Sequence, residues 1–227
     1  MNQNIIDVKL QEAVMTKFRK ARNQKGFTLV ELAIVLVIIG IILAGIIKGQ
    51  ELITNAKIKR AFTAQKEMTA AIYTYYDRYG KFPGDDNTAI ARWGATYNGN
   101  GNGIIEGGTI GTDAAPGTMF TCAAGTASET CAMWEHLRLA GIISGTATVG
   151  AGRLNPSHPY GGTIGVVNGA VSGLTANWIG LSRLPENVAQ TLDIQNDDGS
   201  AITGSVRGNQ AFVSPITENP VSQFFKF

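Results

Sequence analysis

The residues of this chain best suited to hold a metal ion lie in one glycine-rich stretch, "NGNGNGIIEG". Asn98, Asn100 and Asn102 alternate with glycines and Glu106 follows, an alternation of oxygen ligands that also begins EF-hand calcium loops. Calcium sites prefer several carboxylates, and only Glu106 is charged here. Five aspartates elsewhere could contribute if the fold gathers them: Asp85, Asp86, Asp193, Asp197 and Asp198. The simpler interpretation, which we favour, is a run of Asn-Gly and Asp-Gly turns formed for backbone reasons.

The chain has two cysteines, Cys122 and Cys131. An even pair in an exported domain predicts a disulfide, which would stabilise the domain by roughly 2–3 kcal/mol for so short a loop. Two free thiols are the alternative. A metal site is not indicated, because no further ligands stand at a suitable spacing from the pair.

No group of residues in the sequence is typical of an enzyme. Glu135-His136 lacks the second histidine of a zinc protease motif, and His158 lies in a proline-flanked stretch. The sequence has no nucleophile elbow, and "GNGNG" does not stand between a strand and a helix as a nucleotide-binding glycine loop would. We therefore expect a protein that is not an enzyme and that has no cofactor, calcium being the one possibility.

The charges are distributed unevenly along the 227 residues. Residues 1–26 contain six of the nineteen Lys and Arg and two of the seventeen acids, which leaves thirteen basic and fifteen acidic groups for the rest. Phosphate binding needs Lys and Arg clustered on the folded part, so no nucleic-acid partner is expected. The length allows one globular domain and one elongated element.

Residues 27–47 form an apolar run long enough to cross a membrane. The run has 21 residues with Glu31 as its only charge, and a helix of this length spans roughly 30 Å. The basic residues before it predict that the N-terminus stays in the cytoplasm. No small-residue cleavage site follows, so the run is expected to remain in the mature protein. An ionised Glu31 would cost about 2.5–3.5 kcal/mol near the bilayer centre.

The stretch "KGFTLVE" that contains Glu31 resembles the processing site of type IV pilins and of the pseudopilins of type II secretion. The resemblance rests on a basic leader, a glycine, a phenylalanine and a glutamate fifth in an otherwise apolar helix. It implies that a membrane-embedded prepilin peptidase cuts between Gly26 and Phe27 and methylates the new amine of Phe27.

The resemblance also implies a role for Glu31 in assembly. Cleavage would create a cationic amine at Phe27, and the Glu31 carboxylate of a neighbouring subunit could pair with it away from water. Such pairing is strong in low dielectric once both groups are desolvated, so it would set the register between subunits. The alternative is a carboxylate that reaches the lipid headgroups or is protonated.

An apolar stripe predicts that the helix continues beyond the membrane run. Its members recur every three or four positions: Ile58, Ala61, Phe62, Gln65, Met68, Ile72, Tyr75, Tyr76 and Tyr79. Gly80 and Pro83 predict the end, so we expect one helix over residues 27–79. We interpret the tyrosines as rings packed on the head, in preference to a stacking or electron-carrying patch.

The remaining residues, 80–227, are rich in Gly, Thr, Ser and Asn, which is typical of short strands and many turns. Residues 163–171 predict a hairpin that turns at Asn168-Gly169. Another strand is expected over residues 211–213.

Two helices are predicted in this head. The first follows Ser128 as N-cap and ends at Gly141. Its inward side chains are expected to be Met133, Trp134 and Leu137. The second has Pro185 near its first turn and is followed by a turn at Asp198-Gly199.

These features predict an α+β fold: a long N-terminal helix, with a membrane half and a packed half, against a small antiparallel β-sheet head, as in pilins. The expected parts are a cytoplasmic leader (1–26), the helix (27–79, with 27–47 as transmembrane segment and filament core) and a globular exported head (80–227).

The resemblance implies a structural subunit of a type IV pilus-like or type II secretion pseudopilus filament, a helical homo-oligomer. The implied partners are prepilin peptidase, an inner-membrane assembly platform and, before assembly, membrane lipid. The implied location is the bacterial inner membrane before assembly and a periplasmic or cell-surface filament afterwards. The alternative is a single-pass inner-membrane-anchored binding protein with a ligand-recognising head, in which Gly26-Phe27 and Glu31 would have no role. Pilus, secretion pseudopilus and DNA-uptake pseudopilus remain open.

Overall fold

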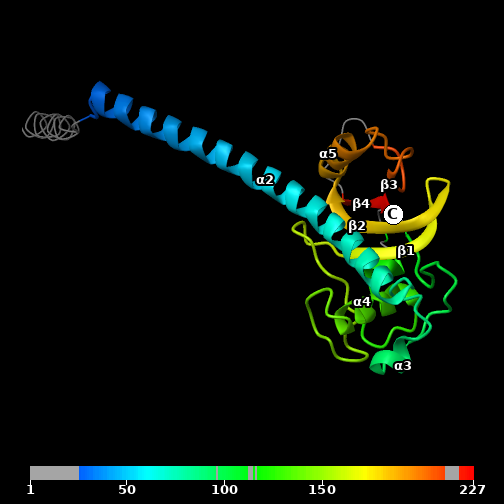
Figure 1. Cartoon of the computed structure of the whole chain (residues 1–227). Coiled ribbons are helices and arrows are strands. Elements are labelled where there is room, and N and C mark those ends of the chain that lie inside the picture. The colour runs from blue at the N-terminus through cyan, green and yellow to red at the C-terminus, as the bar shows by residue number, and fades with distance from the viewer. Residues whose placement is uncertain (1–25, 96, 112–114, 116, 213–219) are drawn as a thin grey trace, which may run out of the picture. The chain divides into compact units, whose positions relative to one another are not determined.

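The fold is taken from a computed structural model that describes residues 26–95, 97–111, 115, 117–212 and 220–227. The chain divides into two compact units, Met1–Leu52 and Ile53–Phe227. Figure 1 shows the course of the chain through both. The predicted leader lies outside the described residues, apart from Gly26.

The long predicted helix is confirmed as α2, Leu29–Tyr79. It ends as expected, because Gly80 has a φ of 68° and donates its N–H to the carbonyl of Tyr76 at 2.7 Å. Glycine favours this left-handed cap. Among the described residues, α2 is the one helix that is long and apolar enough to cross a membrane.

The part of α2 from Ile53 onward belongs to the second unit and buries one face there. The buried side chains recur at helical spacing: Ala61, Gln65, Met68, Ala71, Ile72 and Tyr75. The predicted stripe is confirmed along most of its length. It is wrong at Tyr76, which is 43% exposed and rests its ring against Phe82, with centroids 4.8 Å apart.

The second unit contains one antiparallel sheet with the strand order β1-β2-β4-β3. Its strands are β1 (Ile164–Val171), β2 (Leu174–Pro185), β3 (Val206–Gly208) and β4 (Pro220–Lys226). Alternate side chains face two hydrophobic clusters. The larger cluster joins the sheet to α2, and the smaller one contains Met119 and Phe120. A long helix and a small antiparallel sheet are the predicted α+β layout.

The predicted hairpin turn at Asn168-Gly169 is wrong. The chain turns at Ser172 and Gly173, with φ of 44° and 81°, which is the two-residue geometry of a tight hairpin. Asn168 instead lies opposite Asn177 within the β1–β2 ladder and binds its side chain at 3.0 Å. Gly169 has a packing role, because a Cβ there would stand 2.7 Å from the side chain of Ile110.

The strand expected over residues 211–213 is also wrong for its described part, since Ala211 and Phe212 are not in a strand and Val213 lies outside the described residues. The last strand is β4. It pairs with β2 because its buried phenylalanines, Phe224 and Phe225, supply side chains to the two clusters.

Both predicted head helices are confirmed. Helix α4 (Glu129–Leu139) begins at Ser128, whose Oγ accepts the N–H of Cys131 at 3.3 Å, and its predicted inward side chains are buried. Helix α5 (Glu186–Asn196) follows Pro185. The other helical segments are α3 (Ala89–Trp93) and the 3-10 turn η2 (Thr118–Phe120).

Candidate functional site

The described residues of the first unit form a helix whose apolar side chains are exposed. Phe27 is 82% exposed, Leu29 is 86% exposed, and the large aliphatic residues up to Leu52 are all exposed. Monomeric soluble proteins rarely expose so large an apolar surface. This helix is therefore built to contact lipid or other apolar helices.

Glu31 caps the helix that carries it. Thr28 Oγ1 accepts the Glu31 N–H at 3.1 Å, and Glu31 Oε2 accepts the Thr28 N–H at 2.8 Å and its hydroxyl at 2.9 Å. This reciprocal pair is a capping box, which satisfies two backbone donors at the helix start. Thr28 was not predicted as a functional residue, although the Thr-x-x-Glu spacing before an apolar run signals this motif.

The predicted cleavage bond lies just before the helix. Gly26, Phe27 and Thr28 are outside regular secondary structure, and both Gly26 and Phe27 are exposed. A Cβ added at Gly26 would meet no atom of the described residues within 4 Å. The described part of the fold therefore does not itself require glycine at position 26.

Cys122 and Cys131 form the predicted disulfide, with their Cα atoms 5.3 Å apart. It joins the segment after η2 to the first turn of α4, beside the Ser128 cap. Both cysteines are buried. The disulfide therefore holds the start of α4 covalently, in addition to the Ser128 cap.

The asparagines of the calcium-like stretch accept backbone N–H groups, and Asn100 and Asn102 do so within local turns. Asn98 Oδ1 accepts the Ile90 N–H, and Asn100 Oδ1 and Asn102 Oδ1 each accept the N–H two residues on, all at 2.8–2.9 Å. Asn100 Nδ2 donates to Glu106 Oε2 at 3.2 Å. These contacts support the simpler interpretation of the stretch, and calcium binding there stays a prediction.

Carboxylates from outside this stretch organise it. Asp85 accepts the N–H groups of Gly101, Asn102 and Gly103 at 2.6–3.0 Å. Glu129, at the start of α4, accepts the N–H groups of Asn100 and Glu106 at 2.9 Å each. Burial raises the pKa of Glu129, against the opposing effect of these two hydrogen bonds. The role of Glu129 was not predicted, since it depends on tertiary contact.

The suggested aspartates do not meet at one place. Asp85 serves the loop just described, and Asp86 binds Tyr75 and Arg92. Asp193, Asp197 and Asp198 form a separate group, in which one carboxylate oxygen from each residue lies within 4.8 Å of the other two.

Glu135 and His136 have structural partners. Glu135 Oε2 accepts from Arg153 Nε at 2.6 Å, and both side chains are buried. The Gly84 N–H donates to His136 Nδ1 at 3.0 Å, so Nε2 carries the proton and donates to the carbonyl of Tyr97 at 3.0 Å. Burial lowers the pKa of His136. A neutral imidazole with both nitrogens engaged is not poised for catalysis.

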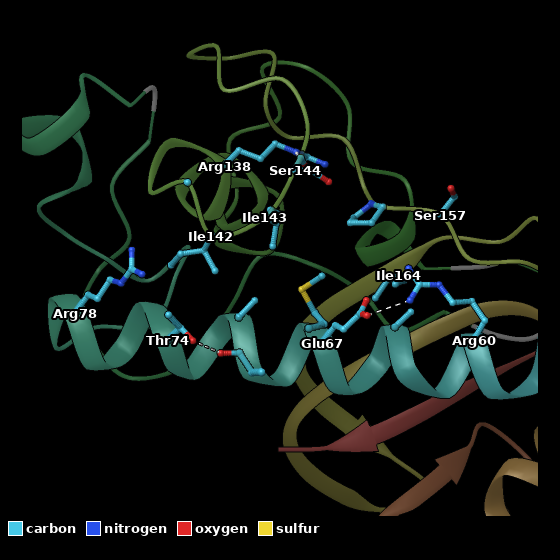
Figure 2. Close-up of a pocket in the computed structure, with 16 residues that line it drawn as sticks. Arg60, Glu67, Thr74, Arg78, Arg138, Ile142, Ile143, Ser144, Ser157 and Ile164 are labelled. Atoms are coloured by element: carbon cyan, nitrogen blue, oxygen red, sulfur yellow. Dashed lines mark hydrogen bonds and ion pairs between the residues drawn. The ribbon is translucent and has the colours of Figure 1, made fainter.

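An open groove of about 790 Å³ lies beside α2 in the second unit. Figure 2 shows Arg60, Glu67 and Arg78 along its α2 side and Arg138, Ile142 and Ile143 on the facing wall. Arg60 and Glu67 pair at 3.0 Å on the exposed rim. The groove brings together no nucleophile and general base among the residues that the structure describes.

Comparison with known proteins defines the class of this chain. A family model described as the prokaryotic N-terminal methylation motif matches residues 21–47. The chain is 33% identical over 126 residues to the fimbrial protein EcpC of Eikenella corrodens, which covers 49% of this chain and 81% of that protein. No solved structure matches it significantly.

Two neisserial proteins match over a shorter length. A fimbrial protein of Neisseria meningitidis serogroup B (strain ATCC BAA-335 / MC58) and the type IV major pilin protein PilE1 of Neisseria gonorrhoeae are each 36% identical over 67 residues, which is 29% of this chain. The matches cover 39% and 41% of those proteins. The chain belongs to the type IV pilin family. It is accordingly a structural protein and not an enzyme.

Proposed function

We propose that this chain is the precursor of a pilus subunit. In this proposal prepilin peptidase cuts between Gly26 and Phe27 and methylates the Phe27 amine, while the apolar part of α2 holds the protein in the bacterial inner membrane with its N-terminus in the cytoplasm. An inner-membrane assembly platform then extracts it into a helical homo-oligomer at the cell surface. The observation that carries the proposal is the exposed apolar run of residues 27–47, whose one carboxylate, Glu31, stands fifth from the proposed cut.

The capping box suggests how Glu31 changes partner during assembly. In the chain described here its carboxylate accepts from Thr28 and has no ion-pair partner among the described residues. Cleavage would place a cationic amine at Phe27, and the exposed Glu31 of an adjacent subunit could approach it. An unpaired carboxylate in lipid is costly, so pairing with the amine would favour the assembled state over the free one.

Family membership supports a pilus filament over the membrane-anchored binding protein considered above. The named relatives are fimbrial proteins and a type IV major pilin. A pseudopilus of a secretion system would use the same helix and the same Glu31 contact. We propose a pilus and not a pseudopilus because the relatives are named as fimbrial proteins and a type IV major pilin.

The test is the mass of the N-terminal peptide of the protein isolated from its native membranes. We expect a chain that begins at N-methylated Phe27. Gly26→Val should remain uncut. Because no described residue lies within 4 Å of the Cβ position of Gly26, a loss of cutting would report peptidase recognition rather than misfolding. Gly40→Val, at an equally open position, is the matched control and should be cut normally. A wild-type chain that still begins at Met1 beside an active peptidase would contradict the proposal.

A further inference from the structure

Residues 98–103 repeat the pair Asn-Gly three times, and this pair has a chemical reactivity of its own. Once the glycine nitrogen loses its proton, it can attack the side-chain carbonyl carbon of the asparagine before it. A C–N bond then forms and a succinimide ring closes, while the side-chain nitrogen takes up a proton and leaves as ammonia. Water opens the ring to aspartate or isoaspartate, so the net reaction consumes one water and releases one ammonia. Glycine favours the attack because it has no side chain and few backbone restrictions.

Two of the three pairs are open to this reaction by their position in the loop. Asn100 and Asn102 are both exposed, so burial does not keep water from them. Their Oδ1 atoms accept the N–H groups of Asn102 and Ile104 at 2.9 and 2.8 Å. Such a turn folds the asparagine side chain back along its own backbone. Local structure therefore does not remove the side-chain carbonyl from the nitrogen that would attack it.

One carboxylate binds both of the nitrogens that would attack. Asp85 Oδ1 accepts the Gly101 N–H at 2.6 Å, and Asp85 Oδ2 accepts the Gly103 N–H at 2.8 Å. Asp85 is 1% exposed, so water screens its charge weakly. Loss of the proton from either nitrogen would break a charge-assisted hydrogen bond and set a second negative charge against the carboxylate. The contact therefore opposes the first step of the reaction at both exposed pairs.

The fold fixes Asp85 in this position. The N–H of the preceding Gly84 donates to His136 Nδ1 at 3.0 Å. A Cβ at Gly84 would stand 2.3 Å from the carbonyl oxygen of Glu129, and a Cβ at Gly99 would stand 2.3 Å from the Asp85 backbone. Glycine at these two positions lets α4 and the loop close on the segment that carries Asp85. Its carboxylate is thereby held against the loop.

Deamidation would weaken this loop, because acidic groups already lie in it. Asn100 Nδ2 donates to Glu106 Oε2 at 3.2 Å. An aspartate at position 100 would replace that donor by an oxygen, and the two carboxylates would repel each other. The reaction therefore removes a hydrogen bond and adds repulsion.

We propose that Asn100 and Asn102 are deamidation sites and that Asp85 is the positioning residue that keeps their reaction slow in the folded head. Water is the only co-reactant. Asn98 is not one of these sites, because Gly99 is buried and donates its N–H to the carbonyl of Asp86 at 3.1 Å. The proposal concerns the head alone, so it is independent of the proposed pilus function.

The experiment follows deamidation of the full-length protein in detergent, at neutral pH and physiological temperature, by peptide mass spectrometry at each asparagine. Asp85→Asn removes the charge of the side chain and keeps its size. It should speed the reaction at Asn100 and Asn102 by roughly 10–100-fold, the factor that corresponds to a hydrogen bond to a charged group. Asn98 should react no faster than in the wild type, because its glycine nitrogen binds the Asp86 carbonyl.

The matched control is Glu129→Gln, the same kind of substitution at a carboxylate that binds the same loop. Glu129 accepts the N–H groups of Asn100 and Glu106 at 2.9 Å each, and neither of these follows an asparagine. Its rates at Asn100 and Asn102 should therefore stay close to those of the wild type. Equal acceleration by Glu129→Gln and Asp85→Asn would indicate a general loosening of the loop and would overturn the role of Asp85. Unchanged rates in Asp85→Asn would overturn it as well.

Amide hydrogen exchange of the wild-type protein tests the same step without a substitution. Base-catalysed exchange also begins with the loss of the backbone proton, so the N–H groups of Gly101 and Gly103 should exchange at least about tenfold more slowly than in an unstructured peptide of the same sequence. Gly103 is the decisive position, because it is exposed and burial does not explain its protection. Exchange at the peptide rate would overturn the proposal even if Asp85→Asn did not fold.

Discussion

Tyr75 donates its phenolic hydroxyl to Asp86 Oδ2 at 2.7 Å, and both residues are fully buried. The bond ties the packed half of α2 to the segment that follows its end. Arg92 Nη1 donates to the same carboxylate oxygen at 2.6 Å, and Thr88 donates to the other. Burial alone would raise the pKa of Asp86, but the hydrogen bonds from Thr88, Tyr75 and Arg92 outweigh it and lower the pKa to about 2.

Asp86→Asn should destabilise the head by about 2 kcal/mol, because the amide cannot serve Tyr75 and Arg92 as the carboxylate does. Arg92 is 31% exposed, so solvent screening keeps the effect from being larger. The expected fall in Tm is roughly 4–8 °C at pH 7. Asp77→Asn, at an exposed position of α2, is the control and should change Tm little. Equal effects of the two substitutions on Tm would contradict the stabilising role of Asp86.

The same bond predicts an acid dependence. The folded-state pKa of Asp86 lies below its ordinary 3.8, so its stabilisation is present above pH 3.8 and is lost as the pH falls towards 2. Wild-type Tm should therefore drop more steeply than that of Asp86→Asn over this interval. Parallel curves for the two proteins would count against the lowered pKa.

Glu31→Leu should insert into the membrane and be cut, yet fail to enter filaments. The substitution removes the carboxylate that we propose pairs with the Phe27 amine, while the helix keeps its apolar surface. Glu51→Leu is the control, because Glu51 is exposed on the same helix and pairs only with Lys48 among the described residues. The measurement is the amount of sheared filament per cell. Normal filament yield from Glu31→Leu would refute the pairing mechanism.

Reduction of the disulfide should destabilise the head by roughly 2–3 kcal/mol, as expected for the short loop that Cys122 and Cys131 close. The check is the Tm of the wild type with and without a thiol reductant. The double variant Cys122→Ser, Cys131→Ser should unfold at the lower temperature in both conditions. A reductant effect on that variant would mean that the change comes from another source.

Two buried histidines predict a loss of stability in mild acid. Burial lowers the pKa of His136 and of His158, so the unfolded chain takes up protons near the ordinary value of 6.5 before the folded one does. Tm should fall as the pH decreases from 7 to 5. His136→Gln, which cannot titrate, should show a smaller fall. An unchanged Tm across this interval in the wild type would contradict both pKa directions.

At the Tyr-rich end of α2, the sequence predicted the burial of some tyrosines correctly but not of all. Tyr75 is buried with its ring 4.6 Å from that of Tyr79, in agreement with rings packed on the head. Tyr73 and Tyr76 are exposed. The apolar stripe wrongly placed Tyr76 among the buried side chains. At the edge of a packed helix face, the neighbouring segment decides how far a side chain is buried. Here Tyr73 contacts Phe227, and Tyr76 contacts Phe82.

The sequence by itself determined the features that depend on neighbouring residues. These are the apolar run with its glutamate, the extent of α2, the Ser128 cap of α4 and the glycine that ends each of those two helices. Each follows from side-chain spacing or from backbone preferences over a few residues. The Thr28–Glu31 capping box belongs to the same kind, although it was not predicted.

Only the tertiary structure decided which residues from distant segments contact one another. Asn168-Gly169 has the sequence of a turn, but β2 pairs alongside it and Ile110 occupies the space over Gly169, so the turn forms at Ser172-Gly173. Asp85 and Asp86 are adjacent, yet one binds a glycine-rich loop and the other binds α2. The contact between Asp193 and Gln223, from α5 and β4, has the same origin: long-range packing sets which polar groups meet, and local preference contains no information about it.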